Sequence, residues 1–441
     1  HLISGPLGSM VGAYEAVIEN LCTSADGIRP KIVASTATIS RADQQIRNLY
    51  GRNEVCLFPP VGLDAADSFF AKQARFRDGS LQPGRLYVGV LAPGHGSLQT
   101  TQVRCFASLM QGAASVGDTA DKADPWWTLL VFFNSIRELG GAATLFASDI
   151  REYLRVLQSR CGSDIARTRK LTNVEELTSR IRSDEVPKIL AMLEQKIQTI
   201  DARTRQPLPV KVIDACLASN IIEVGVDVPR LAMMAVVGQP KTTSQYIQVT
   251  SRVGRKADRP GLVTVLYGQT KPRDRSHYER FRSYHQKLYA HVEPTSVTPF
   301  SPPAMDRALH GLIAALVRQK GRLQYEAQTP DPYPLEEGSP LRDLIQNVLS
   351  ERVSAVAPEE LSGVMDRMVD RLEEWRAWNP QTYGDFGPPP ENASLMHPAG
   401  TKMPATWNNH SWATLSSLRN VDANCEAAVT GWFNEVREQD V

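Results

Sequence analysis

The 441-residue sequence lacks several features that would place it in a narrow class of proteins. Its longest apolar run, around residues 126–133, is far too short to cross a lipid bilayer, and no secretory or transit segment is visible. The six cysteines include no Cys-x-x-Cys pair, which argues against a zinc ribbon and against a disulfide framework. We therefore expect a cytoplasmic protein with no membrane anchor and no structural metal, whose thiols are reduced and buried.

An excess of charge of one sign is also missing. Lysine and arginine number 49 and aspartate and glutamate 48, so the formal net charge is +1. A protein that binds nucleic acid still needs a basic surface, so the distribution of these charges matters more than their sum. An apolar content of 42% and a length of 441 residues indicate a globular protein of two or three domains.

What the sequence does contain is an alternation of strand and helix patterns. Continuous apolar, β-branched runs are typical of strands in a parallel sheet that is covered on both faces. The predicted strands occupy 32–34, 86–92, 127–135, 210–219, 231–238 and 261–268. The helical patterns occupy 41–50, 98–116, 173–183 and 243–255. The predicted fold class is therefore α/β, with helices on both faces of a parallel sheet.

The two ends of the chain have helical patterns. Apolar residues of 9–22 recur at helical spacing, and the face that they share is predicted to be buried: Val11, Tyr14, Val17, Ile18 and Leu21. Prolines become frequent towards the C-terminus, where helical patterns occupy 305–320 and 340–376, the second interrupted near Pro358. We expect residues 291–441 to form a mostly helical accessory region.

The stretch 217–255 carries the residues most suited to chemistry. It contains E-V-G-V-D after a predicted strand and Q-x-x-S-R-x-x-R on a predicted helix. Taken alone, the first is a common exit from a strand, and the second could be a solvated helix face. Their combination in this order, with a strand between them, is more specific and points to a phosphate site.

Each residue type in this stretch suits a phosphoryl group that carries negative charge in a transition state. Arg252 and Arg255 lie three apart and are predicted to share a helix face, so two guanidinium groups can meet phosphate oxygens. Gln248, one turn earlier, can orient a water molecule or a neighbouring side chain. Gly225 lets the backbone approach a ligand closely. Asp227 can accept a hydrogen bond from a ribose hydroxyl or organise an arginine.

A basic and aromatic stretch overlaps this window and continues beyond it. Residues 252–287 contain ten lysines and arginines against three acids, with Tyr278, Phe281 and Tyr284 interleaved. Positive charge combined with aromatic rings suits a groove that tracks phosphates and stacks bases. The alternative is a solvated basic helix whose aromatic rings point into the core. The residues favoured as nucleic-acid contacts are Arg273, Arg275 and His277.

Taken in order along the chain, these stretches resemble the conserved motifs of the superfamily 2 helicases, ATP-driven nucleic-acid motors with two RecA-like lobes. Residues 35–38 (STAT) resemble the third motif, 132–135 (FFNS) the fourth, and 225–227 and 248–255 the fifth and sixth. The resemblance implies that ATP lies between the lobes and that nucleic acid crosses both. Ser251 stands where many members have glycine, but serine is small enough to fit.

The resemblance also implies roles for single residues. By it, Gly225, Asp227, Arg252 and Arg255 contact ATP, and Gln248 belongs to the sixth motif with the two arginines. Arg255 is then the arginine finger, with Arg252 beside it. The residues that would couple nucleotide state to nucleic-acid grip are Ser35, Thr36, Ala37 and Thr38. The residues expected near the nucleic-acid backbone are Asn134, Ser135, Arg137 and Thr250, and for each of these a helix cap is the alternative.

Longer phrases point to one branch of the superfamily. ISGPLGSMVGAYE, QYIQVTSRVGR and the run from RDRSHYERFRSYH to VEPTSVTPFS resemble the DrmA-like helicases of bacterial DISARM anti-phage systems and their MrfA-like relatives. This resemblance covers most of residues 1–310. It implies a role in phage defence, DNA with a single-stranded portion as partner, and a second, DrmB-like subunit. MrfA-like relatives often carry a four-cysteine zinc module, which this sequence lacks.

Two motifs of such a motor are missing from the sequence. It has no G-x-x-x-x-G-K-[ST] loop for the ATP phosphates and no acid pair in the expected place for Mg2+. His1 resembles the last residue of an Asp-Glu-x-His signature, which would make it a catalytic residue that couples the ATP site to the third motif at 35–38. The alternative is an accident of cloning. We therefore expect the Mg2+ ligands before residue 1, and no ATP turnover by this chain alone. The predicted division is the end of the first lobe at 1–40, the second lobe at 41–290 and the accessory region at 291–441.

Other functions stay open on the sequence alone. A RecA-like lobe kept only to bind DNA or a partner would have no motor activity, but it would not need an aligned arginine pair. A nuclease is disfavoured, because no D-x-E-x-K cluster or metal-ligand spacing occurs. The favoured hypothesis is an ATP-dependent DNA helicase or translocase to which this chain supplies the second lobe.

Overall fold

The computed structural model divides the chain into two compact units. Unit 1 consists of His1–Phe58 and Pro294–Val441, and unit 2 of Pro59–Glu293. The residues that the structure describes are 3, 5–36, 38–60, 69–115, 120–161, 169–182, 184–197, 212–220, 227–256, 258–321, 330, 335–384, 393–400 and 410–415.

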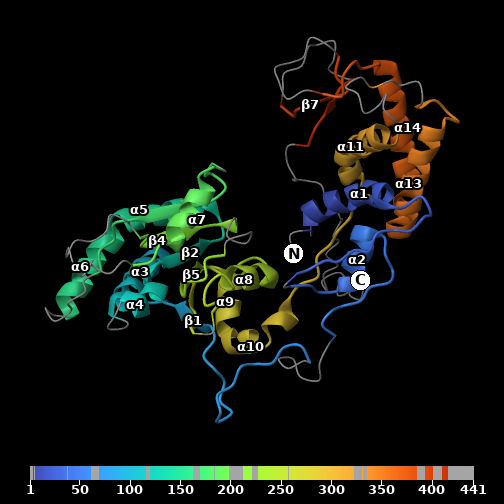
Figure 1. Ribbon diagram of the computed structural model, residues 1–441. Helices are drawn as coiled ribbons and strands as arrows, with labels where there is room; N and C mark the ends of the chain where they lie inside the picture. The colour runs from blue at the N-terminus through green and yellow to red at the C-terminus, as the bar shows by residue number, and fades with distance from the viewer. Residues whose placement is uncertain are drawn as a thin grey trace, which may run out of the picture. The chain divides into compact units, whose positions relative to one another are not determined.

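Unit 2 is built on a six-stranded sheet in which each strand runs parallel to its neighbours (Figure 1). The strand order is β1-β6-β5-β2-β4-β3. The strands are β1 (Leu86–Leu91), β2 (Leu129–Phe133), β3 (Val174–Leu177), β4 (Ala215–Ala218), β5 (Met233–Val237) and β6 (Leu262–Tyr267). The prediction of a parallel α/β sheet is confirmed.

Helices cover both faces of this sheet. One face packs against α3 (Leu98–Ser115), α5 (Ile136–Ala147) and α6 (Asp149–Cys161). The other packs against α7 (Val186–Glu194), α8 (Thr243–Thr250) and α10 (Phe281–Gln286). Alternate residues of a strand point to opposite faces of the sheet, and here helices cover both faces. All five residues of β2 are therefore buried, which explains its unbroken apolar sequence.

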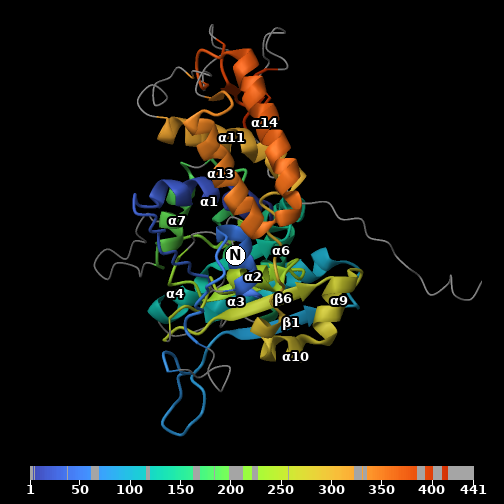
Figure 2. The same cartoon turned by 90° about the vertical axis from the view of Figure 1, so that its right-hand side faces the viewer.

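The described part of unit 2 contains further short helices. They are α4 (Ala120–Trp127), α9 (Pro272–Glu279) and the 3-10 turn η2 (Leu288–His291). Figure 2 shows α9 and α10 beside β1 and β6. Gly89 in β1 makes this approach close, because a Cβ there would lie 2.8 Å from the Phe281 ring. The basic stretch is therefore packed onto one edge of the sheet.

Unit 1 is mainly helical and joins the two ends of the chain. Its elements are α1 (Gly5–Cys22), α2 (Ala42–Tyr50), α11 (Pro302–Lys320), α13 (Pro340–Val356), η4 (Pro358–Glu360) and α14 (Leu361–Trp378), with the short parallel pair β7 (Met396–His397) and β8 (Trp412–Ala413). The helix break predicted near Pro358 is confirmed. α1 packs against α2, α11 and α13, so 1–40 and the C-terminal region share one core, which the sequence patterns did not indicate.

Two predicted elements are wrong. In place of the helix predicted at 173–183, Val174–Leu177 form the edge strand β3. Glu175 and Glu176 fit helical propensity, but their backbone pairs with β4, and an edge strand tolerates charge. Residues 32–34 are exposed coil rather than a strand, with Val33 85% exposed. A strand needs a hydrogen-bonding neighbour, and in the described part of the chain none lies beside this segment.

The buried face predicted for the first helix holds only in part. Val17 is buried as predicted, but the core of unit 1 otherwise takes Met10 and Ala13 from α1. Ile18 is 47% exposed, and Tyr14 and Leu21 are each more than one-third exposed. Small side chains let a helix approach its neighbour closely. On the facing helix α11, Gly311 has no side chain, and this leaves room for the Tyr14 hydroxyl. The contact is decided by shape rather than by the stripe of large apolar residues.

The predicted burial of the thiols holds only in part. Cys216 is buried, but Cys22 and Cys56 are exposed, because they lie at the end of α1 and in an open segment rather than in the sheet. The described helices include none with the length and apolarity that a membrane crossing demands. Nor do the described histidine, cysteine and acidic side chains gather in a group of three that could hold a metal ion.

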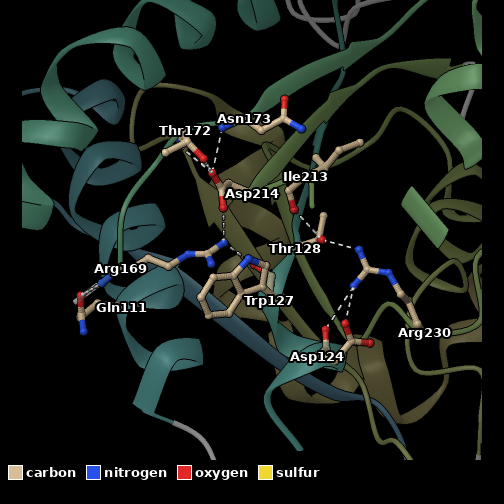
Figure 3. Close-up of polar contacts among 10 residues, drawn as sticks. All are labelled: Gln111, Asp124, Trp127, Thr128, Arg169, Thr172, Asn173, Ile213, Asp214 and Arg230. Atoms are coloured by element: carbon tan, nitrogen blue, oxygen red, sulfur yellow. Dashed lines mark hydrogen bonds and ion pairs between the residues drawn. The ribbon is translucent and has the colours of Figure 1, made fainter. Parts of the chain in front are cut away.

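A buried ion pair ties together loops at the amino-terminal edge of the sheet (Figure 3). Nη2 of Arg169 lies 3.0 Å from Oδ1 of Asp214, and its guanidinium stacks 3.5 Å from the centre of the Trp127 ring. Oδ2 of Asp214 accepts the backbone N–H groups of Thr172 (2.6 Å) and Asn173 (2.9 Å). Burial lowers the pKa of Arg169 to about 10, although Asp214 counteracts this. One carboxylate therefore holds the entries to both β3 and β4.

A second buried arginine, Arg230, is drawn in the same view as this ion pair (Figure 3). Arg230 forms an ion pair with Asp124 at 3.6 Å and donates to the Thr128 hydroxyl at 2.7 Å. That hydroxyl donates in turn to the carbonyl of Ile213 (2.7 Å). These bonds join the segments that lead into β2, β4 and β5. The amino-terminal edge of the sheet is thus rigid before any ligand is considered.

Candidate functional site

The predicted site residues are divided between the two units. Ser35, Thr36 and Thr38 lie in unit 1, and the residues of the later motifs lie in unit 2. His1, Ala37 and Gly225 lie outside the described residues, so the predictions on them stay predictions.

The two predicted arginines of the sixth motif lie on a tight turn, residues 251–255, named the arginine turn below. α8 ends at Thr250, so the expectation that Arg252 and Arg255 share a helix face is wrong. The N–H of Ser251 still donates to Ile247 O (3.0 Å) and that of Arg252 to Val249 O (3.1 Å). Val253, fully buried, anchors the turn between the two arginines.

Gly254 shapes the turn that follows α8. Its φ is +62°, a conformation that L side chains rarely adopt, and its N–H donates to the carbonyl of Leu231 at 2.9 Å. A Cβ at this position would lie 2.5 Å from the backbone of Gly261, which precedes β6. Two glycine backbones are therefore pressed together, and they fix where Arg255 leaves the turn.

The structure brings Arg255 together with Asp227. Their side chains form an ion pair, and Asp227 belongs to the segment that leads towards β5. Arg255 is one-third exposed and Asp227 two-thirds exposed, so the pair can be reached from solvent. Gln248 is half-buried one turn earlier in α8, where its carbonyl accepts from the Ser251 hydroxyl (2.8 Å).

A different set of contacts holds the carboxyl-terminal edge of the sheet. Asp274, 1% exposed at the start of α9, accepts from the N–H of Gly268 (2.8 Å) and the N–H of Gln239 (3.0 Å). Nδ2 of Asn134 donates to the carbonyls of Val237 (3.0 Å) and Gly238 (3.1 Å). The ends of β2, β5 and β6 are thereby tied to α9.

The predicted nucleic-acid contacts on α9 lie around this buried carboxylate. Arg273 and Arg275 flank Asp274 in sequence and are both exposed. His277 is half-buried with its ring 4.7 Å from that of Tyr284, and burial followed by the nearby charge of Arg273 lowers its pKa. The two arginines are thus presented to solvent from a fixed base, whereas His277 is partly used in packing.

Of the aromatic residues in the basic stretch, Tyr284 is buried and Phe281 packs against the core, whereas Tyr278 is exposed. Tyr246 of α8, fully buried, and His285 of α10 bond through the tyrosine hydroxyl and Nε2 (2.8 Å). Nδ1 of His285 lies 2.7 Å from Phe281 O, which only accepts, so Nδ1 carries the proton and Nε2 accepts from Tyr246. Burial lowers the pKa of His285 and raises that of Tyr246, which favours this neutral pair.

Sequence reasoning missed a second link between α8 and the basic stretch. Glu293 accepts the N–H of Thr243 (2.8 Å) and its hydroxyl (3.0 Å) at the first turn of α8. The Tyr284 hydroxyl also donates to Thr243 (3.1 Å). An acid near the N-terminus of a helix can be recognised in a sequence when the two are neighbours, but Glu293 lies 50 residues after Thr243. The arginine turn and the basic helices therefore belong to one connected body.

The remaining predicted contacts differ in accessibility. Ser135 and Arg137 are exposed at the start of α5, where the Ser135 hydroxyl caps the helix by accepting from Glu138 N (3.2 Å). Thr250 is 1% exposed and donates to Tyr246 O (2.8 Å), so the structure does not bring it to the surface.

In unit 1, local hydrogen bonds link Thr36 and Thr38 of the third motif. The Thr36 hydroxyl accepts from Thr38 N (3.3 Å) and donates to Thr38 O (3.2 Å). Thr38 is buried, while Ser35 and Thr36 are exposed.

The arrangement in unit 2 suits a polyanion at two places. Arg252 and Arg255, on the arginine turn, are fixed cations of the type that stabilise a polyphosphate, and guanidinium donors fit phosphate oxygens. Arg273, Arg275 and Arg137 offer positive charge at the other edge of the sheet. These residues fit the phosphates of ATP and of nucleic acid, while Mg2+ would need carboxylates from elsewhere.

Comparison with known proteins agrees with this chemistry. Residues 129–257 match the helicase conserved C-terminal domain. The chain is 40% identical over 385 residues to the DISARM protein DrmA of Bacillus paralicheniformis. The aligned region covers 85% of this chain and 32% of that protein. The chain thus spans about a third of the length of the curated relative that it matches.

Solved structures with a similar arrangement include two helicases. The DUF1998 helicase MrfA bound to DNA and AMPPNP is 14% identical, with a TM-score of 0.43 over 79% of this chain and 39% of that chain. The Mycobacterium smegmatis helicase Lhr bound to ssDNA and AMP-PNP is 13% identical, with a TM-score of 0.48 over 85% of this chain and 36% of that chain. The sheet of unit 2 is RecA-like, as predicted.

Proposed function

Because this chain belongs to the superfamily 2 helicases and has a DrmA-like sequence, we propose that it supplies the second RecA-like lobe of an ATP-driven DNA helicase or translocase. The motor acts in anti-phage defence of the DISARM type. Its other parts are a first lobe, which contributes the phosphate loop and the Mg2+ ligands, and a DrmB-like subunit.

The arginine turn carries this proposal. Arg255 and Arg252 are held on a turn that Gly254, Gly261 and Val253 make rigid. Cations fixed in advance stabilise the charge that develops on a transferred phosphoryl group without reorganising during the reaction. Arg255 acts as the arginine finger, and Arg252 binds phosphate oxygens beside it. Gln248 orients the attacking water or a neighbouring side chain.

Asp227 keeps Arg255 in place until nucleotide binds. Because their ion pair is largely exposed, solvent screens it, and it is weak enough to be exchanged for a phosphate. By the family resemblance, Gly225 would let the backbone approach the ribose, and Asp227 would accept a hydrogen bond from a ribose hydroxyl. ATP supplies the phosphoryl group, and Mg2+ neutralises part of its charge.

Nucleic acid follows the other edge of the sheet. Arg273 and Arg275 contact phosphates from the base that Asp274 fixes, and Ser135, Arg137 and His277 extend this surface. Asn134 and Thr250 support the surface through their bonds to backbone carbonyls rather than touching the strand. Coupling of the two sites is the role of 35–38 and His1.

Replacing Arg255 with alanine in the full-length protein tests the proposal. We expect DNA-stimulated ATP hydrolysis to fall by roughly 10³-fold or more, while affinity for single-stranded DNA changes little. Arg180→Ala, an exposed arginine on the loop after β3, is the matched control and should hydrolyse ATP normally. A full-length protein that binds DNA but hydrolyses no ATP would instead be a binding module, and activity retained in R255A would refute the arginine finger. The 441-residue chain alone is expected to show no turnover.

The nucleic-acid surface has a separate test. Arg273→Ala and Arg275→Ala should each weaken binding of a single-stranded oligonucleotide and reduce the slope of log affinity against log salt by about 1. Fluorescence anisotropy over a range of salt concentrations, with DNA and RNA of the same sequence, measures both effects. Arg182→Ala, exposed on the far edge of the sheet beside Asp184, is the control. Unchanged slopes in both variants would remove α9 from the interface.

A further inference from the structure

Arg85, the residue before β1, reaches across to the arginine turn although 166 residues separate it from Ser251. Its Nε donates to the carbonyl of Val253 at 2.8 Å, and its Nη2 lies 3.5 Å from the carbonyl of Ser251. Carbonyls at the end of a helix have no partner inside the helix, and a cation there is favourable. One guanidinium therefore engages backbone carbonyls on both sides of Arg252.

The aliphatic stem of Arg85 closes the same turn. Its Cγ lies 3.4 Å from the position that a Cβ would take on Gly254 and 3.2 Å from that on Gly261. The N–H of Leu86, the next residue, donates to Gly261 O at 2.7 Å. The stem thus covers the contact between the two glycines, and β1 locks the stem in place.

These contacts point to a role beyond local packing. Val253 anchors the arginine turn in the core, and Gly254 anchors it to Leu231. Arg85 contributes the side chain that fixes the peptide planes between those anchors. The directions in which Arg252 and Arg255 leave the backbone depend on these planes.

We propose that Arg85 is a positioning residue for ATP hydrolysis: it touches no nucleotide, but it holds Arg252 and Arg255 in the geometry that the reaction needs. The inference rests on the function proposed for the arginine turn. A misplacement of a catalytic group by about 1 Å can lower a rate by roughly 10²-fold. Loss of Arg85 should therefore act on kcat and leave nucleotide and DNA binding in place.

Two substitutions in the full-length protein separate positioning from packing. Arg85→Met keeps the volume of the stem and removes the donors, and it should lower kcat by about 10- to 100-fold with KM for ATP little changed. Arg85→Lys keeps one donor at the end of a similar stem and should recover part of the rate. Arg77→Met is the matched control, because Arg77 is an exposed arginine eight positions earlier that has no hydrogen bond or ion pair within the described residues.

A second measurement does not depend on ATP hydrolysis. In the 441-residue chain, hydrogen exchange at the amides of 252–256 should accelerate in R85M and not in R77M, while exchange in β5 and the melting temperature stay as in the wild type. Unchanged exchange in 252–256 would overturn the inference, as would normal kcat in R85M of an active protein. A drop in melting temperature and DNA affinity together with kcat would assign Arg85 to general stability instead. Faster exchange in R85M of a full-length protein that has no ATPase activity would refute the proposed motor function. It would still show that Arg85 holds the arginine turn.

Discussion

The two units bury charge in different places. In the described residues of unit 2, Arg169–Asp214 and Arg230–Asp124 lie at the amino-terminal edge of a sheet, where they join loops. In unit 1, the buried Arg352 pairs with Glu19 and donates to Leu49 O (3.4 Å), so it joins three helices from opposite ends of the chain. In both units a buried charge marks the place where segments distant in sequence must meet.

The exposed surfaces of the two units also differ. Unit 2 exposes Arg255, Arg273 and Arg275. The first follows the close contact of Gly254 with Gly261, and the other two flank the buried Asp274. Unit 1 presents Ile18 and Leu21 along α1, and unit 2 also exposes large apolar side chains, Phe69 among them. A fixed guanidinium suits a phosphate, whereas an apolar side chain has no electrostatic preference. The phosphate chemistry that we propose accordingly rests on arginines of unit 2.

The largest stability effect is expected where unit 2 buries a carboxylate. Asp214→Ala removes the partner of Arg169 and the acceptor of two backbone N–H groups, which should destabilise unit 2 by about 3–5 kcal/mol. Urea unfolding followed by hydrogen exchange in β3 and β4 measures this loss. Asp184→Ala, which breaks an exposed ion pair with Arg182, should leave the midpoint unchanged. Equal midpoints for the two variants would mean that the buried pair does not hold the edge.

The stability of unit 1 should fall at acid pH because it buries His310. Burial in the helical core, then the charge of Arg371, lowers the pKa of His310 to about 4, although Glu374 counteracts this. Between pH 6.5 and about 4 the unfolded chain takes up a proton that folded unit 1 does not, so stability falls by up to about 1.4 kcal/mol per pH unit. His310→Gln should flatten this slope for α11 in hydrogen exchange. A slope that persists in H310Q would show that other groups cause the acid sensitivity.

The smallest effects test which face of α1 is buried. Ala13→Leu adds volume where α1 meets the unit 1 core and should cost about 1–3 kcal/mol. Ile18→Ala removes a side chain that is 47% exposed and should change stability by no more than about 0.5 kcal/mol. Thermal melting of both variants gives the comparison. The reverse order would restore the face that the apolar pattern predicts.

The same contrast explains where prediction from the sequence worked. Strands β2, β5 and β6 are buried on both faces, so each is an unbroken apolar run that is easily recognised. The edge strand β3 has one neighbour and is half-buried, and its glutamates favoured a helix. In α1 the pattern of large apolar residues was misleading, because close packing onto α11 selects small ones.

The candidate site divides in a similar way. Arg252 and Arg255 were identified from the sequence because their spacing is part of a local pattern. Arg85, Asp274 and Glu293 were missed, because each acts on a backbone group that only folding brings near. A single arginine or acid in a loop has no distinguishing neighbours in sequence. Their roles are visible as distances and not as motifs.

The sequence by itself determined the parallel α/β core, since burial on two faces of a sheet leaves a local pattern, and it supplied the arginines on which the proposed phosphate chemistry rests. The tertiary structure decided how that chemistry is held: the helix ends at Thr250, Gly254 meets Gly261, and Arg85 closes the turn. It also decided that 1–58 packs with the C-terminal region. The physical reason is that backbone hydrogen bonds and helix contacts between distant segments depend on shape and distance, which no local pattern encodes.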